Sequence, residues 1–226
     1  MSTQTKTKTK ASDMLVLAAL AYLLTLVAPF LNGFAPANNL VVSLILRAVC
    51  IAAWVFGAWG LVITAKKECG YNVVDKNDKP STLQWILTAV VTVVFLAYCT
   101  IDGLDSIQNT LATLEVASDY VYFITYHIMN VAQALVVTLI VVFAQKAGDK
   151  LGLGKYIPYG GIALGLCWAV VSLIGSTDLI FPTVGNILIP ALWRLAYGIV
   201  FGVIYLVSGK KPIYALPFMT VAFVLM

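Results

Sequence analysis

Histidine and charged residues are scarce in this sequence. It contains one histidine, His127, and charged residues make up 11% of its 226 residues, compared with about 25% in an average soluble domain. One histidine is too few for bis-histidine haem ligation or for a multi-histidine metal site. The last apolar run has no lysine, which excludes a retinal Schiff base of the microbial-rhodopsin kind.

Motifs of ATP-driven pumps and of several membrane enzymes are absent as well. The sequence has no Walker A motif, no G-x-S-x-G and no Glu-Glu-x-x-x-Arg pair, so it does not drive transport by its own ATP hydrolysis. Its four cysteines have no paired spacing, so neither a disulfide framework nor a zinc knuckle is indicated. We expect no cofactor and no metal, and the balance is against an enzyme.

Apolar residues are abundant, because 61% of the chain is hydrophobic. A helix needs about 20 mostly apolar residues to cross a hydrocarbon core of about 30 Å. The sequence therefore predicts an all-α, polytopic membrane protein in which residues 14–226 form one domain of seven transmembrane helices behind a basic tail, 1–13. The predicted spans are 14–34, 40–64, 83–101, 119–145, 159–177, 187–208 and 212–226.

The lysines are distributed on one side of this topology. They occur in the N-terminal tail and in the loops after the second, fourth and sixth spans, whereas the loops after the first, third and fifth spans have no lysine or arginine. Positive charge near span ends marks the cytoplasmic side. We expect a cytoplasmic N-terminus, an outer C-terminus and a prokaryotic plasma (inner) membrane. The short basic loops are typical of topology signals and contacts with membrane lipids, and not of nucleic-acid binding.

The loop after the third span has a different pattern. Apolar residues follow one another at Leu104, Ile107, Leu111 and Leu114, the spacing of one stripe along a helix. The pattern predicts a short amphipathic helix over about 105–117, either at rest in the outer membrane interface or acting as a lid over the bundle.

The even-numbered spans resemble one another in their spacing. Each begins with a polar residue and has a further polar or charged residue two to three turns deeper, at Arg47, Asn130 and Arg194. This spacing is typical of one helix followed by three similar hairpins. Shared topology alone would also produce it.

Arg47 and Arg194 are the two arginines of the chain, and both lie inside apolar runs. Each is eight residues beyond an asparagine that begins its span, about 12 Å below the outer end of the helix. An arginine at the centre of a span costs roughly 2.5–3.5 kcal/mol, so both need partners. Asp102, at the outer end of the third span, is a candidate, with Asp105 and Asp178. Two interpretations are open: a structural Arg–Asp clamp, or an arginine with donors free for an anionic ligand.

Polar residues also recur along the fourth span. His127, Asn130 and Gln133 are three residues apart, so they lie on adjoining turns of roughly one face. Lipid offers no hydrogen bonds, so this face should point into the bundle. There it would either bond to other helices or line a ligand site, with His127 as a proton-sensitive group.

Small residues four apart predict close helix contacts. Three such pairs are present: Ala53 with Gly57, Gly161 with Gly165, and Gly198 with Gly202. Pairs of this kind let helix backbones approach one another in membranes.

Together these features predict an outward-facing polar pocket. Its expected ligand-binding residues are Arg47, Asp102, His127, Asn130, Gln133 and Arg194. The corresponding function is binding or transport of a small polar, anionic solute, by the chain alone or as the substrate-capturing subunit of a larger transporter, with a partner subunit or a homo-oligomer as alternatives. A second hypothesis is an accessory subunit whose polar core is purely structural. A third is an intramembrane enzyme that uses His127.

Overall fold

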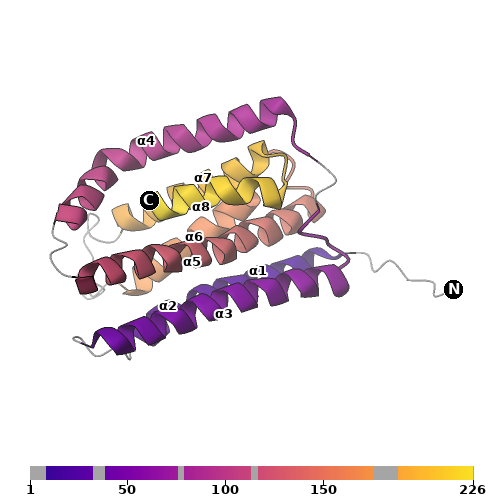
Figure 1. Ribbon diagram of the computed structural model, residues 1–226. Coiled ribbons are helices and arrows are strands. Elements are labelled where there is room, and N and C mark those ends of the chain that lie inside the picture. The colour runs from indigo at the N-terminus through magenta and orange to yellow at the C-terminus, as the bar shows by residue number, and fades with distance from the viewer. Residues whose placement is uncertain (1–8, 33–38, 76–78, 113–116, 176–187, 226) are drawn as a thin grey trace.

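The structure, a computed structural model, describes residues 9–32, 39–75, 79–112, 117–175 and 188–225. Every regular element within these residues is a helix, as predicted (Figure 1). The helices are α1 Ala11–Thr25, α2 Val27–Asn32, α3 Leu40–Lys67, α4 Thr82–Ala112, α5 Ala117–Lys150, α6 Tyr159–Gly175, α7 Ile189–Val207 and α8 Pro212–Leu225.

The helices agree with the seven predicted apolar runs, because α1 and α2 together occupy the first. Within the described part of the chain, five stretches are long and apolar enough to cross a membrane: Ala11–Leu31, Leu40–Lys67, Thr82–Cys99, Asp119–Lys150 and Ile189–Val207. α6 and α8 are apolar but shorter. The length and composition of the five spans indicate an integral membrane protein.

The first span is broken between α1 and α2 for a local reason. Pro29 has no N–H, and its ring crowds the carbonyl of Thr25, where α1 ends. The Thr25 hydroxyl donates to the Tyr22 carbonyl at 2.6 Å. The indole of Trp54 on α3 donates to the carbonyl of Leu24 at 2.7 Å. The break is therefore compensated by a side chain of its own helix and by one from a neighbour.

α5 is the central helix of the bundle. It packs against α1, α3, α6 and α8, and its side chains are almost continuously buried between Val136 and Gly148. α4 packs against α7 and α8 on the side away from α3 (Figure 1). α3 and α4 therefore do not form the first of three similar packed hairpins that the spacing suggested.

The contact between α6 and α7 is the closest in the described bundle. A Cβ atom added to Gly198 would collide with backbone atoms of Gly165, and one added to Gly202 would lie 2.7 Å from the Cα of Gly161. The two glycine pairs predicted to allow close approach thus face each other across one joint. Gly57 makes a third close contact, with the side chain of Leu24 on α1.

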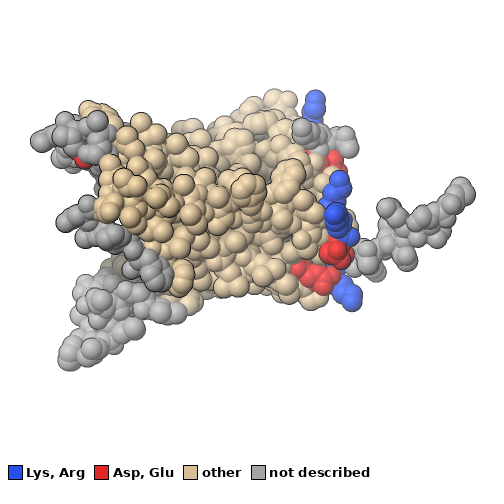
Figure 2. All heavy atoms as spheres, turned by 60° about the horizontal axis from the view of Figure 1, so that its bottom comes forward, with Lys and Arg blue, Asp and Glu red and all other residues tan. Residues whose placement is uncertain are grey.

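The described lysines gather at one end of the bundle, where α1 begins and α3 ends (Figure 2). We call this end the basic end, and the other the opposite end. At the opposite end, α4 continues as a helix to Ala112, so the first part of the segment predicted as a separate amphipathic helix, 105–117, is the end of α4. The rest of that segment lies largely outside the described residues.

Candidate functional site

Arg47 is held against α5 near the opposite end. α3 begins after Asn39, whose side chain accepts a hydrogen bond from the N–H of Val42, and Arg47 follows two turns later. The residue is only 7% exposed. Its Nη1 donates to the Tyr122 carbonyl at 2.9 Å and to the Thr125 hydroxyl at 3.2 Å. Both partners belong to α5, so the guanidinium joins α3 to the central helix.

An aromatic face lies beside this guanidinium. The Arg47 Cζ lies 3.6 Å from the centroid of the Tyr122 ring and 5.8 Å from that of Tyr126. Stacking of this kind stabilises a desolvated guanidinium. The hydrogen bonds use Nη1, and among the described residues Nη2 and Nε have no hydrogen-bond partner. The position of the guanidinium is thus fixed through Nη1, while Nη2 and Nε make no hydrogen bond to a described residue.

The polar stripe of α5 begins next to this site. His127, Asn130 and Gln133 are all half-buried. The His127 ring packs edge-on against Phe123, with centroids 4.4 Å apart, and against Tyr126. Within the described residues, no hydrogen bond joins any of the three polar side chains to Arg47. The stripe therefore continues along α5 from the level of Arg47 toward the middle of the span, without a hydrogen bond to Arg47 among the described residues.

Arg194 lies in a different environment from Arg47. It is exposed on α7, between neighbours such as Leu192 and Trp193 that are exposed as well, and no ion pair joins it to another described residue. α7 packs chiefly against α6, whereas α3 packs against α5 and α1. The structure therefore does not bring the two arginines together. Asp102 lies within α4, but its side chain, like those of Asp105 and Asp178, is outside the described residues.

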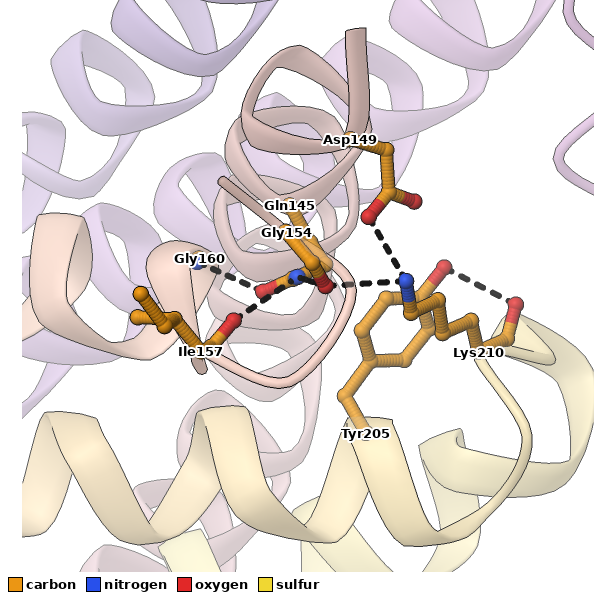
Figure 3. A network of polar contacts seen from close by, with 7 residues as sticks. All are labelled: Gln145, Asp149, Gly154, Ile157, Gly160, Tyr205 and Lys210. Atoms are coloured by element: carbon orange, nitrogen blue, oxygen red, sulfur yellow. Dashed lines mark hydrogen bonds and ion pairs between the residues drawn. The ribbon is translucent and has the colours of Figure 1, made fainter. Parts of the chain in front are cut away.

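A polar network at the basic end was not anticipated from the sequence (Figure 3). The side chain of Gln145 on α5 is fully buried. Its Nε2 donates to the carbonyls of Gly154 and Ile157 at 2.8 and 3.1 Å, and its Oε1 accepts from the N–H of Gly160 at 2.9 Å. One amide thus fixes the turn that leads from α5 into α6.

A lysine–aspartate pair extends this network to α7. Lys210 Nζ lies 2.6 Å from an Asp149 oxygen and donates to the Gly154 carbonyl at 2.9 Å. It is the one ion pair between described residues. The Lys210 carbonyl accepts from the Tyr205 hydroxyl. Burial raises the pKa of Tyr71, the neighbouring Tyr205 hydroxyl opposes this effect, and the negative charge of Asp149 adds to it.

The sequence carried little signal for this network. Gln145 ends an apolar run, and Asp149 and Lys210 lie in lysine-bearing turns, where polar residues are usually solvated. The contacts depend on the chain returning to α5 at Gly154 and Gly160, which spacing alone does not show. The fully buried side-chain nitrogen and oxygen atoms of the described residues all have hydrogen-bond partners. The network is therefore a saturated structural joint, whereas Nη2 and Nε of Arg47 keep some exposed surface.

An apolar groove lies between α3, α5 and α8. Its volume is about 460 Å³, within the range of about 300–1,000 Å³ that is usual for ligand sites. Its one side-chain hydroxyl, that of Thr138, already donates to the Ala134 carbonyl at 2.8 Å. Apart from the indole N–H of Trp59, the lining side chains have no unused hydrogen-bond donor, so the groove suits hydrocarbon better than a polar solute.

Comparison with models of known protein families, with curated proteins and with solved structures gives no match for this chain. Its function has to be argued from the geometry alone.

Proposed function

We propose that this integral membrane protein binds a small anionic solute at Arg47, from the outer side of a prokaryotic plasma membrane. The orientation rests on the gathering of the described lysines at the basic end (Figure 2), because positively charged span ends favour the cytoplasm. Arg47 then lies in the outer half of the protein. Binding of this kind suits a transporter or the solute-capturing subunit of one.

The observation that carries the proposal is the partial use of the Arg47 guanidinium. Tyr122 and Thr125 fix its position through Nη1, while Nη2 and Nε have no partner among the described residues. Arginine donors form short, charge-assisted hydrogen bonds with carboxylates and phosphates. Because the residue is largely buried, an anion bound there would also relieve the cost of an uncompensated charge.

The polar stripe of α5 would extend such a site from Arg47 toward the middle of the membrane. Asn130 and Gln133 follow Arg47's partners Tyr122 and Thr125 along the same helix, toward the middle of the span. Their amides can both donate and accept hydrogen bonds, and the imidazole of His127 adds a further ring nitrogen for hydrogen bonding. A solute with an anionic and a polar part would meet the arginine first and the stripe next.

The test is anion-dependent thermal unfolding of the full chain in phosphatidylcholine nanodiscs. Acetate, succinate and inorganic phosphate would each be compared with chloride at equal ionic strength. We expect at least one of the three to raise the melting temperature of the wild type and of Arg194→Gln, but not of Arg47→Gln. Arg194→Gln is the matched control, because it removes the other arginine from a similar depth.

Two results would overturn the proposal. One is an equal shift in Arg47→Gln and the wild type, which would place the anion elsewhere. The other is the absence of a specific shift with any of the three anions.

One observation favours a second function, that of an accessory subunit. Arg194 is exposed on a membrane-spanning helix, and a carboxylate of a partner subunit would satisfy it. On this hypothesis Arg194→Glu would lose a partner that co-purifies with the wild type, whereas Arg47→Gln would keep it. Unchanged co-purification of Arg194→Glu would remove the hypothesis.

A further inference from the structure

We propose that the groove between α3, α5 and α8 binds an acyl chain of an anionic phospholipid, with the headgroup against Lys66 and Lys146 at the basic end. This site is separate from the one at Arg47, and the inference does not depend on the proposed solute.

The lining of the groove selects hydrocarbon. Val55, Trp59 and Val62 on α3 face Leu139 on α5 and Leu216 on α8. The single hydroxyl among the lining side chains is used within α5. Trp59 is 66% exposed, so the groove opens to the side of the bundle, where the lipid chains lie in a membrane. A polar solute would find only the indole N–H of Trp59 as a side-chain donor there.

The length of the groove fits one leaflet. From Val55 to Lys66 the helix rises about 16 Å at about 1.5 Å per residue. Half of a hydrocarbon core of about 30 Å is about 15 Å. An acyl chain lying along α3 would therefore place its headgroup near Lys66.

Charge at one end of the groove selects the headgroup. Lys66 is exposed and follows Val62 by four residues, so it lies on the groove face one turn closer to the basic end. Lys146 follows Leu139 by two turns on α5, and its Nζ lies 5.0 Å from the centroid of the Tyr71 ring. Two cations from two helices thus flank the end of an apolar groove, the arrangement in which membrane proteins bind anionic lipids.

The test is native mass spectrometry of the detergent-purified full chain with dioleoylphosphatidylglycerol or dioleoylphosphatidylcholine. We expect the wild type to retain one phosphatidylglycerol more strongly than phosphatidylcholine. Lys66→Gln and Lys146→Gln should each lower the affinity for phosphatidylglycerol roughly fivefold. Lys67→Gln is the matched control, because it removes the adjacent charge on a different face of α3, and it should change little.

Filling the groove tests the acyl-chain part separately. Leu216→Trp and Val62→Trp should both abolish retention of either lipid, whereas Val49→Trp, on an exposed part of α3 outside the groove, should not. Using two groove variants keeps the test valid if one of them does not fold. Equal retention of the two lipids by the wild type, retention by a folded groove-filled variant, or a dimer that excludes lipid would each overturn the proposal.

Discussion

The two sides of α5 are built in opposite ways. On the side of α6 and α7, helices meet backbone to backbone through Gly161, Gly165 and Gly198, and the buried amide of Gln145 uses both of its polar atoms. On the side of α3, large side chains leave a groove beside α8, and Arg47 donates to other described residues through Nη1 alone.

This difference indicates which side of α5 serves only to hold the fold together and which side has groups left to bind a ligand. A buried polar group whose donors and acceptors are all used contributes to the fold and has nothing left for a ligand. A largely buried side chain with unused donors that still reach the surface, like an unfilled groove, can take a ligand. We therefore propose that the α6–α7 side is the scaffold and that ligands bind on the α3 side.

The largest effect should come from the glycine joint. In Gly198→Leu, the new side chain would meet the backbone of Gly165, which cannot move aside as a flexible side chain could. We expect a loss of stability that exceeds about 3 kcal/mol, measured by unfolding in mixed micelles. Gly60→Leu is the control, because an added Cβ there meets nothing within 4 Å. If Gly198→Leu and Gly60→Leu lost the same stability, the close packing of α6 against α7 would not matter to the stability of the bundle.

A smaller loss should follow from removing the buried amide. Gln145→Leu leaves the Gly160 N–H without its partner, while the Gly154 carbonyl keeps Lys210 and the Ile157 carbonyl keeps the Tyr159 N–H. We expect a cost on the order of 2 kcal/mol in the same unfolding assay. Gln133→Leu, on the same helix but with no hydrogen bond to another described residue, should cost much less. Equal losses would show that saturation of the amide does not matter.

Removing the buried arginine should change stability less than either. Arg47→Gln gives up two hydrogen bonds and the ring contact, but it also relieves a burial cost of roughly 2.5–3.5 kcal/mol. We expect a net change below about 1 kcal/mol, since each lost hydrogen bond is worth about 0.5–1.5 kcal/mol. If Arg47→Gln lost as much stability as Gln145→Leu, Arg47 would be a structural residue and not a binding residue.

The smallest effect is a pH dependence at the basic end. Because burial raises the pKa of Tyr71 above its ordinary value of 10.0, the folded protein holds this proton to higher pH than the unfolded chain. The resulting stability is complete below pH 10.0 and is lost as the pH rises through the folded pKa. Tyr71→Phe should make the free energy of unfolding fall less steeply in that range. Identical slopes for Tyr71→Phe and the wild type would contradict this.

The sequence predicted the helices and the glycine joint because each depends on local information. Apolar runs of sufficient length form spans, and residues such as Gly198 and Gly202 leave no side chain between helices. The sequence did not distinguish buried Arg47 from exposed Arg194. Both lie in runs that are apolar on every face, so no alternation marks the face that meets a neighbour. The Gln145 network escaped prediction because its partners come from a later turn of the chain.

The most direct test is an experimental structure of the wild type in lipid nanodiscs, determined with the anion that gives the largest thermal shift. The account predicts density for a group that is not part of the chain within hydrogen-bond distance of Nη2 and Nε of Arg47. A carboxylate of the chain itself in that position, from Asp102 or Asp178, would contradict it, because Arg47 would then be a closed clamp and the α3 side would be scaffold as well.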